Sequence, residues 1–286
     1  MKIWKTSRFE LDLSTPRVMG IVNVTPDSFS DGGRYFSRND ALAHAERLLK
    51  EGADVLDIGG ESSRPGALPV ALEDELSRVL PLVRELVKWN VPISVDTYKP
   101  QVMQAVLDAG ADIINDIWAL RMGDAEQVVA AHPSCGVCLM HMHRDPQSMQ
   151  VAPMQGDVLP QVKDFLAQRV QALQAQGVAT DRITIDPGIG FGKTVEQNFS
   201  LLARQTELLS LGVPLLAGWS RKSSLAAVVG NPLAQVASLD DKDRMPPSIA
   251  AAVLAVDRGA RVVRVHDVAA TVAGLKVWGA MRGQAV

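Results

Sequence analysis

The stretch "ALAHAERLLKEGADVLDIG", residues 41–59, decides the fold, because it holds a helix, a helix cap and a strand in succession. Gly52 is placed to end the helix in the left-handed conformation that glycine adopts without strain. The apolar run from residue 54 then predicts a strand. The helix is predicted from apolar side chains that recur with helical period: Leu42, Ala45, Leu48 and Leu49.

The junction between helix and strand recurs along the chain. A glycine followed by an alanine stands at residues 52–53, 110–111 and 259–260, each time between a helical pattern and a strand pattern. Helical periodicity also marks residues 158–177. Pro81, by contrast, predicts a kink or a break in the helix after the second strand. The chain is therefore built from repeated βα units.

Eight runs of apolar and β-branched residues predict strands. Besides the run from residue 54, they are "VMGIVNV" from residue 18, "PISVD" from 92, "DIINDI" from 112, "GVCLMH" from 136, "RITID" from 182, "VPLLAG" from 213 and "RVVRVH" from 261. No change of composition separates the units, and ~250 residues are typical of a closed (β/α)8 barrel. We therefore expect one α/β domain over residues 1–286, a TIM barrel, with an open doubly wound sheet as the alternative.

Composition and charge exclude several classes of partner. The chain is 47% hydrophobic and 21% charged, with a formal net charge of −3, so it has no basic field for nucleic acid or an anionic membrane. The first residues lack the apolar core of a signal peptide, and no apolar run approaches the ~20 residues of a membrane-spanning helix. Only two cysteines are present. We expect a cytoplasmic protein without a disulfide framework.

Polar side chains stand at or just beyond the C-terminal end of every predicted strand. In a closed barrel these ends meet on one face, where barrel enzymes carry their active sites. The sequence therefore predicts a binding site for a small polar molecule on that face. The residues concerned are Asn23, Asp57, Asp96, Asn115, Asp116, His141, Asp186, Ser220, Lys222, His266 and Asp267.

The stretch "IDPGIGFGKT", residues 185–194, resembles a phosphate-binding P-loop only superficially. The P-loop consensus has four residues between its first glycine and the Gly-Lys pair. Counting back from Gly192, Pro187 occupies the place of that first glycine, and proline has no backbone N–H for a phosphate. Asp186 and the glycines that follow it must therefore have another use.

Two cysteines and two histidines suggest a zinc site or a redox pair at Cys135, Cys138, His141 and His143. The segment between them has the pattern of a buried strand, which would separate Cys138 from His141 by ~10 Å. Zinc ligands must converge within ~2.0–2.3 Å of one metal. We therefore favour a buried structural pair of cysteines and assign His143 no role.

Eight motifs, in order and at the eight predicted strand ends, together resemble the dihydropteroate synthase family. The resemblance extends from about residue 18 to about residue 273. It rests on "GIVNVTPDSFSDGG" (20–33), "DIGGESSRPGA" (57–67), "SVDTYKP" (94–100), "IINDI" (113–117), "CLMHMHRDPQSMQ" (138–150), "IDPGIGFGK" (185–193), "SRKS" (220–223) and "RVHDV" (264–268).

The resemblance implies a transferase that joins 6-hydroxymethyl-7,8-dihydropterin pyrophosphate to p-aminobenzoate, giving 7,8-dihydropteroate and pyrophosphate in folate biosynthesis. It implies pterin contacts for Asp96, Asn115, Met140, Asp186, Lys222 and Arg264, and catalytic roles for Arg264, His266, Lys222 and Asp96. Carboxylates and amides suit the donors and acceptors along a pterin edge, because unpaired polar atoms in a closed pocket are costly.

The resemblance also implies sites for the other groups of the reaction. Pyrophosphate is expected at Asn23, Ser63, Arg64, Arg264 and His266, with Mg²⁺ held by Asn23. The p-aminobenzoate pocket is expected at Phe29, Ser63, Arg64, Pro65, Phe191 and Ser220, and sulfonamides, which mimic p-aminobenzoate, are expected to bind there. Ser63 stands where the family usually has threonine, and a homodimer is implied.

Other interpretations remain open at this stage. A methyltetrahydrofolate-dependent methyltransferase would share the barrel and the pterin-binding residues, but it would have no use for a pyrophosphate site. An inactive pterin-binding paralogue is a further alternative. Asp186 could instead cap a helix, and Arg264 could form a surface ion pair. Pro247 is expected at the start of the last helix but one, where proline is tolerated.

Overall fold

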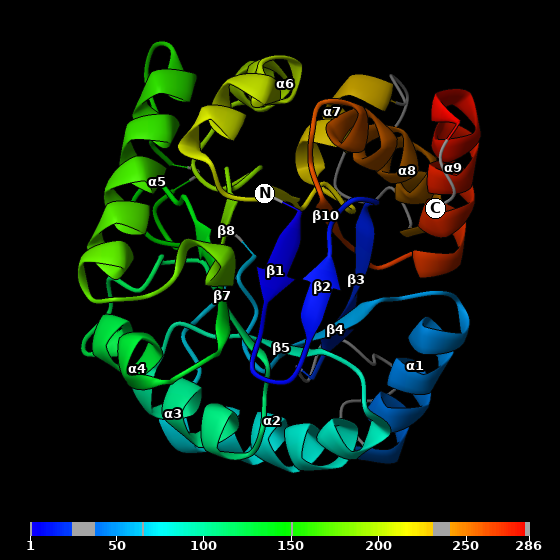
Figure 1. Cartoon of the computed structure of the whole chain (residues 1–286). Coiled ribbons are helices and arrows are strands. Elements are labelled where there is room, and N and C mark those ends of the chain that lie inside the picture. The colour runs from blue at the N-terminus through cyan, green and yellow to red at the C-terminus, as the bar shows by residue number, and fades with distance from the viewer. Residues whose placement is uncertain (1, 25–37, 65, 150, 231–240, 284–286) are drawn as a thin grey trace.

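The chain forms a barrel of eight parallel strands, shown end-on in Figure 1. The computed structural model describes residues 2–24, 38–64, 66–149, 151–230 and 241–283. The barrel strands are β3 (Arg17–Asn23), β4 (Val55–Gly59), β5 (Ile93–Asp96), β6 (Ile113–Asp116), β7 (Gly136–Met140), β8 (Ile183–Asp186), β9 (Leu216–Ala217) and β10 (Val262–Val265). All eight lie within or overlap the predicted runs, so the predicted barrel is confirmed.

The sheet closes between β8 and β9. The ladder runs in the order β8-β7-β6-β5-β4-β3-β10-β9. An isolated parallel bridge joins Ile185 to Leu215, and the amide of Ile185 donates to the carbonyl of Pro214 over 3.0 Å. A closed ring rather than an open doubly wound sheet is the result.

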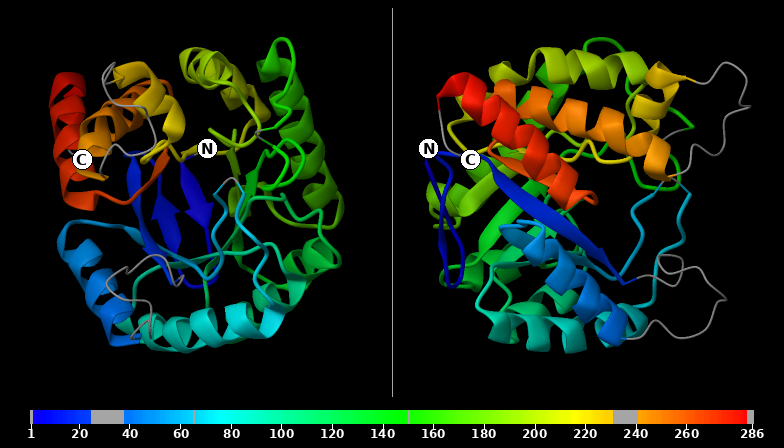
Figure 2. Two further views of the ribbon diagram at one scale, coloured as in Figure 1. Left: turned by 180° about the vertical axis from the view of Figure 1, so that it is seen from behind. Right: turned by 90° about the vertical axis from the view of Figure 1, so that its right-hand side faces the viewer.

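Helices surround the strands (Figures 1 and 2). They are α1 (Arg38–Lys50), α2 (Leu72–Leu86), α3 (Pro100–Asp108), α4 (Ala125–Ala131), α5 (Val158–Ala175), α6 (Val195–Ala203), α7 (Ser223–Val229), α8 (Asp241–Asp257) and α9 (Val268–Arg282). Short 3-10 helices lie at η2 (Val87–Trp89), η3 (Thr180–Arg182) and η4 (Gln205–Leu211). The glycine caps are as predicted, since Gly52, Gly110 and Gly259 have φ of 103°, 98° and 97°.

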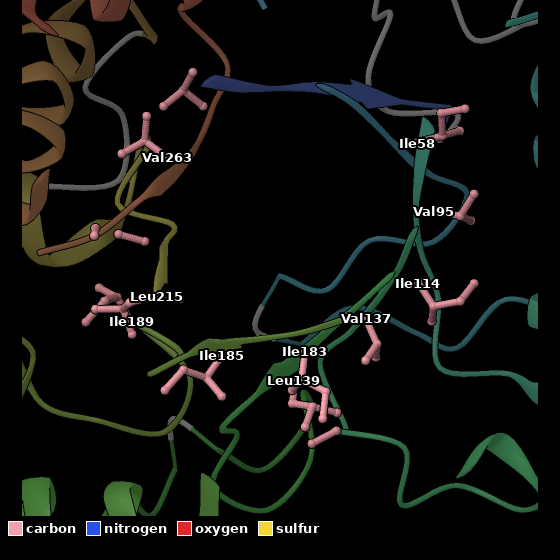
Figure 3. Packing of buried hydrophobic residues seen from close by; sticks show 14 of the residues in the cluster. Ile58, Val95, Ile114, Val137, Leu139, Ile183, Ile185, Ile189, Leu215 and Val263 are labelled. Atoms are coloured by element: carbon pink, nitrogen blue, oxygen red, sulfur yellow. The ribbon is translucent and has the colours of Figure 1, made fainter. Parts of the chain in front are cut away.

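The main hydrophobic core lies between the strands and the helices. Alternate residues of a strand face opposite sides. Figure 3 shows Ile58, Val95, Ile114 and Val137 pointing away from the ring of strands, and all four are fully buried. The remaining side chains of each strand fill the interior of the barrel, where the polar residues of the predicted site also lie.

A short hairpin that the sequence pattern did not predict closes the N-terminal end of the barrel. Strands β1 (Ile3–Lys5) and β2 (Glu10–Asp12) pair in antiparallel fashion across that end (Figure 1). Trp4 is fully buried, and its indole N–H donates to the carbonyl of Arg182 over 2.9 Å. A Cβ on Gly136 would lie 3.1 Å from the carbonyl oxygen of Lys5, so a glycine at residue 136 lets the hairpin approach.

The prediction for Pro247 was wrong, and that for Pro81 was wrong as far as a break is concerned. Pro81 does not split its helix, because α2 continues from Leu72 to Leu86 with the proline inside it, and a kink there stays a prediction. Pro247 lies inside α8 rather than at its start. Pro81 removes one backbone donor from α2, and Pro246 and Pro247 remove two from α8. Both helices are stabilised by burial of an apolar face, which includes Val79, Leu82 and Val83 in α2 and Ala251, Ala252 and Ala255 in α8.

Candidate active site

Four of the predicted site residues at the C-terminal strand ends face the barrel interior at neighbouring positions. Asp116, which the sequence also placed in the site, points to the other side of β6 and accepts from the backbone N–H groups of Trp118 and Leu120. In the strand register, Asp96 lies opposite Asn115, and Met140 lies opposite Asp186. All four side chains come from adjacent parallel strands and therefore line one wall of the same space. The sequence prediction that these residues converge is confirmed by their positions, and their roles toward a ligand are considered below.

Arg264 is held inside this site by two carboxylates. Its Nε donates to Oδ2 of Asp57 over 2.6 Å, and Nη2 donates to Oδ2 of Asp96 over 2.8 Å. Burial disfavours the charge, but the two carboxylates outweigh it and raise the pKa of Arg264. Arg264 is thus in an ion pair, but within the barrel mouth and not in the surface pair that was one interpretation of the sequence, since its side chain is 21% exposed.

Asp96 lies in an environment that opposes its ionisation. Burial raises its pKa to about 7, and the nearby charges of Asp57 and Asp116 act in the same direction, while Arg264 acts against them. A carboxyl group with this pKa exchanges a proton near neutral pH. It can therefore adjust its charge to the donors or the positive charge of a bound molecule.

Asp186 and Lys222 contribute two further buried charged groups to the site. Asp186 Oδ1 accepts from the backbone N–H of Gly188 over 2.7 Å, and burial raises the pKa of this carboxyl group. Burial also lowers the pKa of Lys222 to about 8, although Asp186 favours its charge. Asp186 does not cap a helix, because the next helix, α6, begins later and is capped by Thr194. The ammonium of Lys222 lies 4.2 Å from the centre of the Phe191 ring.

His266 is held in place by Ser220. The hydroxyl of Ser220 accepts the backbone N–H of His266 over 3.1 Å and lies 2.9 Å from Nδ1 of the same residue. Burial lowers the pKa of His266 well below its usual value, and Arg221, Arg264 and Arg64 add to the effect. The imidazole is therefore neutral and carries one N–H, and Ser220 contacts its Nδ1.

The lysine of the glycine-rich stretch is buried and anchors its own loop. Lys193 is 3% exposed, and its ammonium donates to the carbonyl oxygens of Gly188 over 2.8 Å and Phe191 over 3.2 Å. It also lies 3.0 Å from Nδ1 of His141. Burial lowers the pKa of Lys193 to about 7. These contacts hold the loop that joins Asp186 to Phe191, which is a different use from the phosphate binding of a P-loop lysine.

A buried charge cluster holds the loop after β4. Lys99 donates to Glu61 and, over 2.5 Å, to Glu75. Glu61 also accepts from the hydroxyl of Tyr98 over 2.8 Å and from the backbone N–H of Val70 over 3.1 Å. This loop carries Ser63 and Arg64, two residues expected to contact both substrates, so the cluster fixes the position of its two ends.

The remaining predicted site residues within the described part of the chain lie in an apolar cluster, on the loop after β4 and at the end of β3. Met140 and Phe191 are buried in an apolar cluster with Ile117, Met142 and Met149 near the site. Ser63 is half-buried and Arg64 is exposed, and Asn23 ends β3 at the mouth of the barrel. Phe29 and Pro65 lie outside the described residues.

The paired cysteines and histidines do not form a site in the described part of the chain. Cys135 and Cys138 are both free and buried. Among residues 2–24, 38–64, 66–149, 151–230 and 241–283, no group of three or more His, Cys, Asp or Glu side chains could hold a metal ion. Burial raises the pKa of both thiols, which makes them poor nucleophiles.

Sequence reasoning missed three parts of the site. Asp57 was recognised as a polar strand residue but not as a partner of site residues, and Lys193 and Glu61 were not singled out at all. The contacts of Asp57 link residues 37, 58 and 207 positions apart, which no local pattern reveals. A signal was nevertheless present, since a charged residue inside the apolar run "DVLDIG" needs a buried partner.

Comparison with known proteins identifies a family. The model of the pterin binding enzyme family matches residues 19–266. A dihydropteroate synthase of Neisseria meningitidis serogroup C is 48% identical over 283 residues, 98% of this chain and 97% of the relative. Dihydropteroate synthase of Burkholderia cenocepacia, solved with 7,8-dihydropteroate, is 50% identical with a TM-score of 0.87, covering 98% of this chain and 96% of that one. The Yersinia pestis enzyme, solved with a sulfonamide drug complex, is 41% identical with a TM-score of 0.91, covering 98% and 99%.

Proposed function

The chain belongs to the family of pterin binding enzymes, and we propose that it condenses 6-hydroxymethyl-7,8-dihydropterin pyrophosphate with p-aminobenzoate to form 7,8-dihydropteroate. This reaction belongs to folate biosynthesis, and it releases pyrophosphate. The observation that carries the proposal is the buried group at the barrel mouth, in which Asp96, Asn115, Asp186, Lys222 and Arg264 face one space. Such a set of donors and acceptors fits the edge of a pterin ring.

The pterin contacts follow from what each side chain can donate or accept. Asp186 keeps Oδ2 for ring donors while Oδ1 is used by Gly188. Lys222 can only donate and is therefore assigned to the carbonyl side of the ring. Met140, buried beside Asp186 in the register, supplies apolar surface against the ring face. Asp96 is assigned to the side of the pterin that carries the leaving group. It accepts a hydrogen bond from Arg264, which is assigned to the pyrophosphate.

The pyrophosphate site is assigned to the groups that present N–H donors. Arg264 donates to Asp57 through Nε and to Asp96 through Nη2. These two contacts leave the N–H groups of Nη1 for the pyrophosphate. Ser220 contacts Nδ1 of His266, so we assign Nε2 to the pyrophosphate, as a donor in the tautomer that carries the proton there. Arg64 and Ser63 lie on the loop after β4, and the positive charge of Arg64 helps to lower the pKa of His266. These donors stabilise negative charge as it develops on the departing oxygen.

Mg²⁺ fits the end of β3, where Asn23 would hold it. A Cβ on Gly59 would lie 3.3 Å from Oδ1 of Asn23 and crowd it, so the glycine keeps this oxygen accessible. Amide and phosphate oxygens suit Mg²⁺, which is commonly held by one or two protein groups together with substrate phosphates. Bound Mg²⁺ would neutralise charge on the pyrophosphate oxygens.

The p-aminobenzoate pocket is proposed beside the pterin, at Phe29, Ser63, Arg64, Pro65, Phe191 and Ser220. Of the residues that the structure describes, Phe191 supplies a buried ring face and Arg64 an exposed cation that suits the carboxylate of the substrate. Sulfonamides, as mimics of p-aminobenzoate, would occupy the same pocket, and the Yersinia pestis enzyme was solved with a sulfonamide drug complex.

The chemistry is proposed to be dissociative. An arylamine is a weak nucleophile because its lone pair is delocalised into the ring, so the C–O bond to pyrophosphate breaks first. The electron-rich dihydropterin spreads the positive charge, and Asp96, with a pKa of about 7, stabilises it in its ionised form. The amine then attacks. The protein contributes orientation and electrostatic stabilisation, without a covalent intermediate.

A homodimer is proposed from an apolar face on the last two helices. Leu254 of α8 is 46% exposed, and Val277 and Met281 of α9 are 73% and 69% exposed. The two helices lie side by side, so these side chains are candidates for one buried interface (Figure 1). Sedimentation analysis should show a dimer for the natural chain and a monomer for Val277→Glu.

A cytoplasmic location is proposed from the free thiols of Cys135 and Cys138, which fit a reducing compartment. None of the described helices is both long enough and apolar enough to cross a membrane.

The test of the proposed function is direct. The purified chain is supplied with the pterin pyrophosphate, p-aminobenzoate and Mg²⁺, and the release of dihydropteroate and pyrophosphate is followed. A parallel reaction with methyltetrahydrofolate and a methyl acceptor tests the methyltransferase alternative. Folded protein that forms no dihydropteroate would refute the proposal.

A further inference from the structure

Asp57 is a charged side chain in the middle of a buried strand, and its contacts reach three other residues at the barrel mouth. It is fully buried in β4. Oδ1 accepts from the hydroxyl of Ser94 over 2.5 Å. Oδ2 accepts from Nδ2 of Asn115 over 3.2 Å and from Nε of Arg264 over 2.6 Å. A carboxylate in such a place is stable only while these donors are present.

The hydrogen bond to Asp57 sets which way the amide of Asn115 faces. Asp57 lies opposite Ser94, and Asn115 lies opposite Asp96, two residues further along β5. Because an ionised carboxylate can only accept, the amide of Asn115 must turn its NH₂ group toward Asp57, as the contact from Nδ2 shows. Its Oδ1 then points away from Asp57 and is left as an acceptor for a ligand.

The same carboxylate orients Arg264. A guanidinium is planar, so two fixed hydrogen bonds determine the direction of the whole group. Asp57 holds Nε, and Asp96 holds Nη2. Nη1 is the end of the guanidinium that these two contacts leave for an anion.

We propose that Asp57 is a positioning residue, which turns Asn115 Oδ1 toward the pterin and Arg264 Nη1 toward the departing pyrophosphate. The inference rests on the proposed function, because it takes both ligands from it. Asp57 itself need not touch either ligand, since it acts through the orientation of two residues that do.

The test is a double-mutant cycle that exchanges the two side chains. Asp57→Asn replaces an obligatory acceptor by an amide that can turn either its oxygen or its NH₂ group toward residue 115, so the orientation of Asn115 is no longer fixed and the affinity for 6-hydroxymethylpterin should fall about tenfold, which corresponds to one buried hydrogen bond. Asn115→Asp sets two carboxylates against each other and should weaken binding at least as much. The double variant restores an amide-to-carboxylate bond between residues 57 and 115 and keeps an acceptor facing the ligand. Arg264 does not regain its acceptor at residue 57 and keeps only its bond to Asp96, so pterin affinity should recover and kcat should not. The double variant should bind about tenfold more tightly than Asn115→Asp alone.

A matched control separates orientation from general loss of structure. Ser94→Ala removes the other hydrogen bond of Asp57 but leaves its bonds to Asn115 and Arg264 in place. The affinity of this variant should stay within about twofold of the natural chain. Calorimetric titration gives the affinities, and circular dichroism confirms that each variant is folded. In steady-state kinetics, Asp57→Asn should also lower kcat, because Arg264 loses its orientation.

The outcomes distinguish this inference from the proposed function. If the natural chain does not bind 6-hydroxymethylpterin, the proposed function fails and the inference fails with it. If the natural chain binds but the two substitutions are additive, Asp57 is structural only and the inference alone is overturned. Should Asp57→Asn not fold, the double variant decides, because it keeps the hydrogen bond and is expected to fold and to bind. A double variant that neither folds nor binds contradicts the inference.

Discussion

The two ends of the barrel interior differ in chemistry although the same strands build both. The N-terminal end is apolar and is covered by the hairpin β1-β2, which lies at the opposite end of the molecule from the loop after β4 (Figure 2). Trp4 and Leu13 pack there against a layer of inward-facing strand residues. These residues are Met19, Val55, Ile113, Cys138, Leu216 and Val262.

On β4 and β6 the change from apolar to polar takes only two residues. Val55 is followed by Asp57 on β4, and Ile113 is followed by Asn115 on β6. Because alternate residues share a face, each pair points into the same interior at successive depths. The barrel therefore separates its tasks along its axis: the hairpin end contributes stability, and the other end holds buried charges for recognition, several of them with strongly shifted pKa values.

The largest expected effect lies at the hairpin end. Trp4→Ala removes a fully buried indole and should lower the free energy of unfolding by ~3–5 kcal/mol, as measured by urea denaturation. The affinity of the remaining folded protein for a pterin should be unchanged, because the indole lies at the opposite end of the barrel. Trp89→Ala, at a tryptophan that is 36% exposed, is the control and should cost far less. A lowered pterin affinity in folded Trp4→Ala would show that the two ends are coupled.

A nearly equal effect is expected at the polar end, but on turnover instead of stability. Arg264→Ala should lower kcat by ~10²–10³, or ~2.7–4 kcal/mol, because its charge is most useful while pyrophosphate departs. Steady-state kinetics measures this, with Arg261→Ala, three residues earlier and outside the site, as the control. An unchanged kcat with a raised KM for the pterin would mean that Arg264 only binds the ground state.

The contrast between the two ends also explains how much the sequence could predict. The eight strands follow from short apolar runs and the glycine caps from Gly-Ala junctions, and the structure confirms both. The hairpin was missed because strands of three residues, such as β1, are too short to show a period. The family motifs identified the polar end, since each motif is contiguous in sequence.

What the sequence could not predict is pairing within the site. Nothing near Asp57 or Arg264 shows that residues 207 positions apart share a hydrogen bond. Nor does a local pattern reveal that Lys193 donates to loop carbonyl oxygens. Such contacts depend on how the closed sheet brings strands together, and they become visible only when the strand register is known.

A smaller effect should appear in the pH dependence of stability. The pKa of Asp96 is raised to about 7 by burial, whereas an unfolded aspartate has a pKa of ~3.9. Between these values the folded chain binds a proton that the unfolded chain has lost. Stability therefore falls as pH rises from ~4 to ~7, and Asp96→Asn should remove roughly 1–2 kcal/mol of that fall. Urea denaturation at pH 5 and pH 8 measures the difference.

A second buried carboxyl group, that of Asp116, also contributes to the pH dependence. Asp116 also has its pKa raised to about 7, mainly by burial, so the Asp96→Asn variant will keep part of the slope. The informative quantity is therefore the difference between the natural chain and Asp96→Asn at each pH. If the two pH profiles are parallel, Asp96 ionises normally and the polar end is more hydrated than its burial indicates.

The smallest effect is expected at the boundary between the two ends. Thr184 lies two residues before Asp186 on β8 and is fully buried, and its hydroxyl oxygen has no hydrogen-bond partner among the described residues. Thr184→Val keeps the shape of the side chain and removes an unsatisfied polar group. It should raise the free energy of unfolding by up to ~1 kcal/mol, without changing kcat or KM.

Thr97→Val is the matched control for this substitution, and the opposite sign is expected. The hydroxyl of Thr97 donates to Glu75 over 2.7 Å in a buried contact, so its loss leaves a buried carboxylate oxygen unpaired and should cost ~1–3 kcal/mol. Denaturation of both variants in urea gives the two signs directly. If Thr184→Val is also destabilising by ~1 kcal/mol, its hydroxyl must bind an internal water, which typically has about three partners. The polar end would then extend deeper into β8 than into β4, and the boundary between the two ends would be tilted across the barrel.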